Sequence, residues 1–300
     1  MQKSIQNTWL MPALSGLLIF FAVCHVQFFL AWICFAPLFV SIKDGNAKAA
    51  AKKSFITGAV FSCFAYSWMI PGAERFTGSS ILYGIAVFVF AVILFSSWMA
   101  LVNAAFAFIK NKKQKPSSVY FNAMLAGAVF AAGEALLQLI AAGMPWFHFN
   151  AGLALAGNVY AVQPASFGGV YVLSFFAVAI NYLVAEFAAE KKWKLLFIPL
   201  SVTGVYLLSG YIMLLLYEQS LPKQRKFSVA ILSENILPDI KWDDNNGNML
   251  VQKLLQLSKD AVAEKPDIAL WSESVVPWTY QPNDDFVNEV LKTTSAAQVT

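Results

Sequence analysis

The residue best placed for chemistry is Glu273, in the segment LWSESVVP at positions 270–277. It follows Asp267–Trp271 (DIALW), a short apolar run of the kind that forms a β-strand. In open α/β folds, ligands gather at the carboxyl ends of the strands, so a carboxylate here lies where a substrate would bind. Flanked by Trp271 and Val275, Glu273 can have a raised pKa and act as a general base. The alternative is a solvated loop glutamate or a helix-capping acid.

The other candidates are polar or aromatic residues, and each of them has two possible interpretations. Trp242 follows the first strand expected in this part of the chain, and is either near the mouth of a site or an exposed loop aromatic. Glu134 lies within an apolar helix, where carboxylates usually face a partner or a cavity. A substrate role and a structural hydrogen bond both fit it. Trp146, Phe147 and His148 are either interfacial anchors or contacts for lipid acyl chains.

The three cysteines, Cys24, Cys34 and Cys63, all lie inside apolar runs and are expected to pack as small hydrophobic residues. Their spacing suggests neither a metal site nor a disulfide framework, and no cofactor is expected. His25 and His148 have no acid or cysteine nearby in sequence, so both are read as structural.

Composition indicates a membrane protein. Of the 300 residues 58% are hydrophobic and 13% are charged, against about 25% charged in an ordinary soluble domain. Residues 4–42 hold no charge and would make a helix roughly 58 Å long, about twice the ~30 Å hydrocarbon thickness. They are read as two spans with a tight turn near residues 25–27, and not as a cleaved signal peptide. Further uncharged or nearly uncharged runs raise the count to seven spans: 54–73, 76–109, 116–141, 168–185 and 195–217. Residues 141–162 are apolar but broken by Gly and Pro, which favours a surface-lying or re-entrant segment.

The distribution of charge predicts the topology. With seven spans, 12 of the 13 basic residues up to position 217 lie in loops on one side, which places the N-terminus in the cytoplasm. These lysines form short clusters between apolar runs, so they do not indicate nucleic-acid binding. Residues 1–217 carry 13 Lys/Arg and 5 Asp/Glu, whereas residues 218–300 carry 8 and 12. This reversal predicts a domain boundary near 217–226, with the following part on the far side of the membrane.

The tail alternates between strand and helix patterns. Residues 227–232 (FSVAIL) are β-prone, and residues 248–264 place Leu250, Leu254 and Leu257 on one helical face before Pro266. A second strand at 267–271, a helix at 283–296 and the start of a strand at 298–300 follow. This order predicts two β-α units with neighbouring parallel strands.

Two of these segments resemble a known superfamily. IALWSESVVP (268–277) resembles the motif around the catalytic glutamate of the carbon–nitrogen hydrolases (nitrilases), and SVAILSENILPDIKWDD (228–244) resembles that domain's first strand and following loop. Seven spans followed by such a domain resemble the apolipoprotein N-acyltransferase family. Short motifs in the membrane part agree with it: Tyr66-Ser-Trp68, Gly133-Glu134, Met144-Pro-Trp146 and GGVYVLSF at 168–175.

The resemblance implies a helical membrane domain (1–217), a linker (218–226) and the start of an α-β-β-α sandwich domain (227–300). It implies that an acyl chain moves from a phospholipid, through a cysteine thioester, to the amino group of a lipoprotein's diacylglyceryl-cysteine. Glu273 would be the general base, and Trp242 would line the acyl pocket. Tyr66, Trp68, Glu134 and Trp146 would be substrate-binding candidates. The protein would lie in the bacterial inner membrane, with the second domain in the periplasm.

The sequence departs from the family pattern after Glu273. No cysteine follows Cys63, and Lys292 does not match the family's oxyanion-stabilising lysine. The family's eighth span is also missing, so the 300 residues look like the N-terminal part of a longer enzyme and are expected to be inactive alone. Two alternatives remain open: a membrane-tethered amidase or nitrilase with a soluble substrate, and a non-enzymatic transporter or scaffold.

Overall fold

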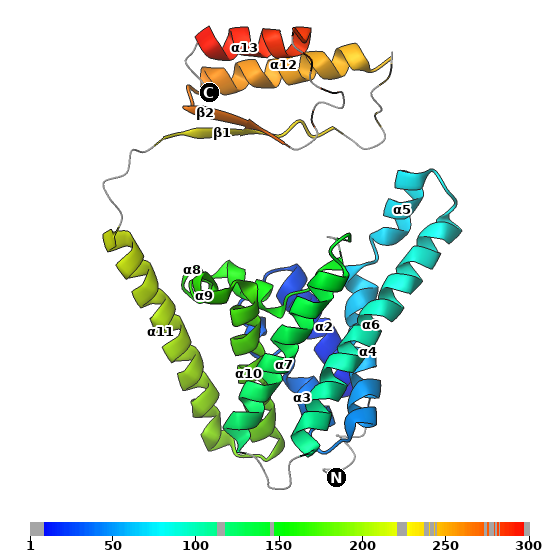
Figure 1. The fold of residues 1–300 in the computed structure, drawn as a ribbon, viewed down its shortest axis with the longest axis vertical. Helices are drawn as coiled ribbons and strands as arrows, with labels where there is room; N and C mark the ends of the chain where they lie inside the picture. The colour runs from blue at the N-terminus through cyan, green and yellow to red at the C-terminus, as the bar shows by residue number, and fades with distance from the viewer. Residues whose placement is uncertain are drawn as a thin grey trace. The chain divides into compact units, whose positions relative to one another are not determined.

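The computed structural model describes residues 9–112, 118–144, 147–220, 227–236, 240, 243, 245–272, 275, 279, 281 and 283–296. The chain divides into two compact units, Met1–Ser220 and Leu221–Thr300. The first unit is helical and the second contains both strands and helices (Figure 1).

The helical unit is a bundle whose elements differ widely in length. Four helices are long and apolar enough to cross a membrane, and α4 with α5, bent by 54° at their junction, would make a fifth. The two earliest helical pieces, α2 and α3, are shorter, and the chain turns at His25 as predicted. The structure therefore supports a helical membrane unit with four or five such spans among the described residues, and the count of seven stays a prediction. In order, the elements are α2 (Leu10–Cys24), η1 (Leu30–Trp32), α3 (Ala36–Ile42), α4 (Ala47–Ala65), α5 (Met69–Thr77), α6 (Ile81–Asn111), α7 (Val119–Ile140), η3 (Ala151–Gly157), α8 (Val159–Val162), α9 (Ala165–Gly168), α10 (Val170–Ala189), η4 (Trp193–Leu196) and α11 (Phe197–Ser220).

One predicted span boundary is wrong. The uncharged run 76–109 was expected to be a single span, but its first residues belong to α5 and the long helix α6 begins only at Ile81. The reason is Gly78, which ends α5 in the left-handed conformation at φ 65°. Absence of charge does not reveal such a helix end, whereas a glycine at this position does.

A buried asparagine satisfies the backbone where the chain breaks between η1 and α3. The side-chain oxygen of Asn181, on α10, accepts hydrogen bonds from the N–H groups of Phe35 (2.8 Å) and Ala36 (3.1 Å). Its amide group donates to the carbonyl of Ala31 at 2.7 Å. Exposed backbone polar groups are costly in an apolar medium, so this residue allows a short 3-10 segment inside the bundle.

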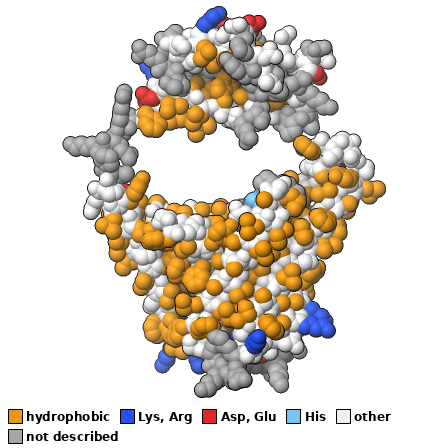
Figure 2. Space-filling model, viewed as in Figure 1, with side chains coloured by type: hydrophobic (Ala, Val, Ile, Leu, Met, Phe, Trp, Pro, Cys, Tyr) orange, Lys and Arg blue, Asp and Glu red, His pale blue; other side chains and the backbone are white. Residues whose placement is uncertain are grey.

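The lysines gather at one end of the helical unit (Figure 2). Lys43, which caps α3, pairs with Glu186 (3.1 Å) and Glu190 (2.9 Å), and Lys192 pairs with the other oxygen of Glu190. Hydrogen bonds from Lys192 and Lys43 lower the pKa of Glu190 to about 2. Burial alone would lower the pKa of Lys43, but the hydrogen bonds of Lys43 to Glu190 and Glu186 outweigh this effect and raise the pKa. Lys110, at the end of α6, donates to the Lys43 carbonyl at 2.8 Å. The clustering of lysines is thus a property of the fold, while the orientation of this end in the cell stays a prediction.

The second unit follows the predicted order of strand, helix, strand and helix. Its elements are β1 (Val229–Leu232), α12 (Gly247–Ala263), β2 (Ile268–Trp271) and α13 (Asp285–Ala296). The strands pair in parallel, with Val229 opposite Ile268 and Leu232 opposite Trp271. Of the predicted apolar face of α12, Leu250 and Leu254 are fully buried. The strand expected at 298–300 lies outside the described residues.

Candidate functional site

The segment between α7 and α10 is built into the core of the helical unit. As predicted it is not one clean helix, because it consists of the 3-10 turn η3 and the four-residue helices α8 and α9. Phe147 and Phe149 precede η3 and are 1% and 4% exposed. Interfacial anchoring is therefore the wrong reading for Phe147, whose ring is surrounded by protein. The Nε2 atom of His148, the next residue, lies 3.2 Å from the carbonyl oxygen of Ala141.

Aromatic rings from α4 and α6, and Phe130 from α7, pack against these two phenylalanines. The ring of Tyr66, at the end of α4, stacks on Phe147 with centroids 5.6 Å apart and planes at 21°. Phe149 contacts Phe61 and Phe95 at 5.2 Å each and Trp98 at 5.7 Å. Such contacts fix the segment in place, since each aromatic pair adds to the energy of burial.

A buried carboxylate holds the same segment from the α7 side. The Oε1 atom of Glu134 accepts a hydrogen bond from the N–H of Ala151 at 2.7 Å, at the first residue of η3. The next N–H, from Gly152, donates to the hydroxyl of Ser174 on α10 at 2.8 Å, and this hydroxyl also faces Glu134. A Cβ at position 152 would lie 2.6 Å from the backbone nitrogen of Ser174, so only glycine allows this approach. Glu134 and Ser174 together supply the acceptors that the open end of η3 requires.

The sequence-predicted residues thus divide into two groups. Tyr66 and Glu134 are buried, at 5% and 1% exposed. Tyr66 contacts Phe147 and Glu134 accepts from Ala151, so both contact the segment between α7 and α10. Trp68 is 53% exposed and does not join them. Trp146 lies outside the described residues. Any contact of these residues with a substrate stays a prediction.

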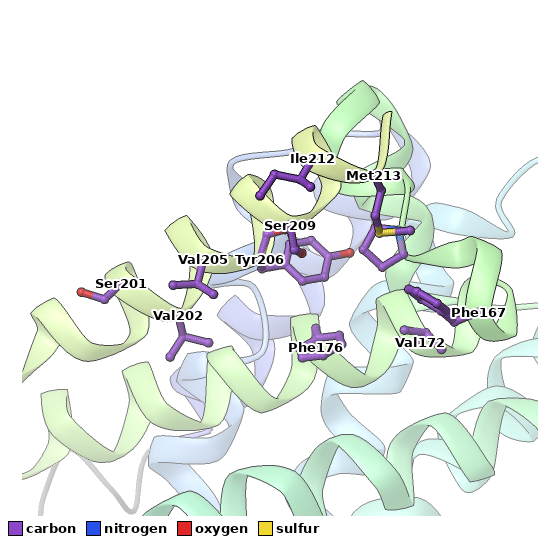
Figure 3. Close-up of a pocket in the computed structure, with 11 residues that line it drawn as sticks. Phe167, Val172, Phe176, Ser201, Val202, Val205, Tyr206, Ser209, Ile212 and Met213 are labelled. Carbon is purple, nitrogen blue, oxygen red and sulfur yellow. Dashed lines mark hydrogen bonds between the residues drawn. The ribbon is translucent and has the colours of Figure 1, made fainter. Parts of the chain in front are cut away.

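Sequence reasoning missed an apolar groove of the helical unit. It has a volume of about 710 Å³ and lies between α10, α9 and α11 (Figure 3). Tyr206 from α11 and Phe176 from α10 face each other in it, with ring centroids 5.2 Å apart. The Tyr206 hydroxyl donates to the carbonyl of Ala161, in α8, at 2.6 Å. A tyrosine in the middle of an apolar span needs such an acceptor, and that was the available signal.

A second apolar groove of about 580 Å³ runs between α6 and α7. Trp98 lines it and donates its indole N–H to the carbonyl of Gly133 at 3.0 Å. Met144 and Phe147, from the segment after α7, also line this groove. Both grooves have almost wholly apolar linings, and this suits hydrocarbon chains better than polar metabolites.

In the second unit, a side-chain hydrogen bond connects the carboxyl ends of the two strands. The hydroxyl of Ser272, directly after β2, donates to Glu234, two residues after β1, at 2.5 Å. This bond holds the pKa of Glu234 below its usual range. Glu273 and Trp242 lie outside the described residues, but Glu273 is the next residue after Ser272 in the sequence. Among the described residues, Glu234 is thus an acidic residue at this edge of the parallel pair.

The described parts of the chain hold no group of three His, Cys, Asp or Glu side chains that could bind a metal ion. The prediction for the cysteines holds only for Cys34, which is buried, because Cys24 and Cys63 are exposed on the helices. Lys292 is solvated as expected and pairs with Glu289 on its own helix.

Comparison with known proteins gives a consistent result. Residues 15–183 match the family model described as "Apolipoprotein N-acyltransferase N-terminal domain". A relative named apolipoprotein N-acyltransferase from Geobacter metallireducens is 27% identical over 299 residues, which is 95% of this chain and 54% of the relative. Relatives with the same name are 28% identical over 178 residues in Allorhizobium ampelinum, covering 57% of this chain and 32% of the relative, and 22% identical over 269 residues in Haemophilus ducreyi, covering 89% and 50%. The chain spans about half the length of the curated relatives that it matches over most of its own length.

Proposed function

The chain belongs to the apolipoprotein N-acyltransferase family, and from this premise we propose that it serves the N-acylation of bacterial lipoproteins with an acyl chain from a membrane phospholipid. The acceptor is the amino group of an N-terminal diacylglyceryl-cysteine. In the reaction the donor's ester C–O bond breaks, an amide C–N bond forms and a lysophospholipid leaves with the proton released by the amine. We further propose that the second unit is the start of a carbon–nitrogen hydrolase-type domain.

The observation that carries this proposal is the parallel pair of β1 and β2. Ligands bind at the carboxyl ends of strands in such sheets, and Glu273 follows the last residue of β2 by two positions. Glu234, the acidic residue after β1, already accepts a hydrogen bond from the hydroxyl of Ser272. We therefore assign the general base to Glu273, and assign Trp242, which follows β1 in the sequence, to the acyl pocket.

The acyl-enzyme belongs to the same proposal. The family resemblance implies a thioester on a cysteine, and a thiolate is a good nucleophile for an ester carbonyl. The three cysteines of these 300 residues lie in the helical unit, and none of them is assigned this role.

The helical unit supports a lipid substrate over a soluble amide. The grooves beside Tyr206 and beside Trp98 are apolar and accommodate hydrocarbon chains. Trp68, being exposed, and Trp146 are proposed to contact lipid. Tyr66 and Glu134 would then act by holding the segment from Phe147 to Gly157 in place for the substrate.

We also propose the orientation. The lysine-rich end of the helical unit faces the cytoplasm of a bacterial inner membrane, because basic residues are enriched in cytoplasmic loops. The N-terminus is then cytoplasmic, and the second unit lies in the periplasm, where lipoproteins are exposed for acylation.

The test uses the protein expressed from its own reading frame, a phospholipid with a labelled acyl chain and a diacylglyceryl-cysteine peptide. Glu273→Gln should lower the rate of peptide acylation by roughly 10²–10⁴-fold, the usual contribution of a general base. The matched control is Glu264→Gln, an exposed glutamate at the end of α12, which should keep the wild-type rate. An unchanged rate in Glu273→Gln would remove the assignment. Hydrolysis of a soluble amide without any acyl transfer by the wild type would favour the amidase alternative.

A further inference from the structure

A third apolar groove, of about 420 Å³, lies at the lysine-rich end of the helical unit. It is formed where α2, α3 and the last turns of α10 meet, and the small side chains Ala185, Ala188 and Ala189 make the hollow. Among the described residues that line it, Lys191 is the charged one, and Trp193 lies beside it. The groove therefore combines an apolar trough with a basic end.

The backbone fixes the position of Lys191 after α10. The N–H of Lys191 bonds to the carbonyl of Ala188 at 3.1 Å, and the N–H of Lys192 bonds to Phe187 at 2.9 Å. These two bonds form a Schellman motif, whose left-handed residue is usually glycine. Here Lys191 occupies that position at φ 55°, against the preference of a residue with a Cβ. The turn thus presents a lysine where glycine would be less strained.

The charge of Lys191 is not balanced by the acidic residues nearby. Glu186 and Glu190 are both engaged by Lys43, and Glu190 also by Lys192. Two carboxylates and two ammonium groups therefore neutralise each other. No ion pair or side-chain hydrogen bond joins Lys191 to another residue in the described parts of the chain, so its ammonium group leaves a positive charge at the groove's end.

We propose that this groove binds an anionic phospholipid, with one acyl chain against the alanines of α10 and the phosphate on Lys191. The trough extends from Met11 to Leu18 on α2, seven residues or about 10 Å along the helix. This length fits within the ~15 Å that one leaflet contributes to the hydrocarbon core. The lipid is a bound component of the helical unit, separate from the acyl donor of the proposed reaction.

Charge selects the kind of lipid. A zwitterionic headgroup carries its own cation next to the phosphate, whereas an anionic headgroup leaves a net charge for Lys191 to neutralise. Trp193, 63% exposed, is of the type enriched at the boundary between headgroups and hydrocarbon, and marks the same depth.

The test is native mass spectrometry of the purified chain in micelles that contain equal amounts of dioleoyl phosphatidylglycerol and dioleoyl phosphatidylcholine. The wild type should retain phosphatidylglycerol preferentially, and Lys191→Ala should lower its retention about fivefold, the effect of one basic residue near a membrane surface. Lys194→Ala, an exposed lysine outside the groove, is the matched control and should change retention little. Ala188→Leu fills the trough and should also lower retention.

A glycine variant separates lipid binding from folding. Lys191→Gly relieves the left-handed strain, so its melting temperature should equal or exceed that of the wild type while phosphatidylglycerol retention still falls. Three results would overturn the proposal: unchanged retention in Lys191→Ala, equal losses in Lys191→Ala and Lys194→Ala, or equal retention of the two lipids by the wild type.

Discussion

The carboxylate of Glu134 accepts a hydrogen bond from the backbone N–H of Ala151, at 2.7 Å and 17 residues further along the chain. This bond joins α7 to the first residue of η3 inside the bundle. It gives this buried polar side chain a structural role, because Oε1 satisfies the N–H of Ala151.

The first prediction concerns this bond. Glu134→Ala leaves the Ala151 N–H buried without its acceptor, and should lower the free energy of unfolding by about 1–3 kcal/mol. Glu134→Gln keeps an acceptor oxygen and should cost less. Thermal unfolding of the purified chain in detergent measures both. Equal losses in the two variants would contradict the assignment of the stabilisation to this acceptor oxygen.

The second prediction concerns the stacked ring of Tyr66. Tyr66→Ala removes a buried ring from its contact with Phe147 and should destabilise the helical unit by about 3–5 kcal/mol, as for other buried aromatic residues. Tyr66→Phe keeps the stack and should cost far less. Trp68→Ala, two residues away but largely exposed, should change stability by no more than about 0.5 kcal/mol. A larger loss in Trp68→Ala than in Tyr66→Ala would contradict the placement of these residues.

The third prediction compares two glycines of α11. A Cβ at Gly210 would lie 1.9 Å from the carbonyl oxygen of Tyr160, whereas a Cβ at Gly204 meets nothing within 4 Å. Gly210→Ala should therefore push α11 from α8 and cost about 1–3 kcal/mol. Gly204→Ala should be neutral or stabilising by up to about 1 kcal/mol, because alanine favours the helix. Similar melting temperatures for the two variants would show that α11 does not pack on α8 as described.

The fourth prediction concerns acid sensitivity at the lysine-rich end. The pKa of Glu190 is lowered from about 4.5 to about 2 by Lys192 and Lys43, so its contribution to stability is fully present above pH 4.5 and is lost as the pH falls towards 2. Its side chain is 35% exposed, so solvent screening keeps this contribution below about 1 kcal/mol.

Unfolding of the wild type and of Glu190→Gln at several pH values tests this assignment. The difference in stability between the two should be constant from pH 7 to about pH 5 and should shrink below it. A difference that stays the same at pH 3 would exclude Glu190 as the titrating group.

Local patterns in the sequence were sufficient for several features. The parallel order of β1 and β2, the buried leucines of α12 and the turn at His25 follow from short-range periodicity and from apolar runs bounded by polar residues. The family assignment also depended on motifs that are contiguous in sequence. Each element involved is encoded in a short segment, which is the range over which a periodic pattern can be read, and the parallel pairing follows from the order of these elements.

Tertiary structure alone decided which residues meet. Apolar composition gives the same signal for a core residue and a lipid-facing one, so it could not place Phe147 inside the bundle or Trp68 outside it. Nor could it supply the partners of Glu134 and Tyr206, since those hydrogen bonds join residues 17 and 45 positions apart. The grooves likewise lie between separate helices. The sequence by itself therefore determined the apolar helical character of the first unit and the order of strands and helices in the second. The contacts between helices, which depend on how the whole bundle packs, determined the surroundings of each described candidate residue.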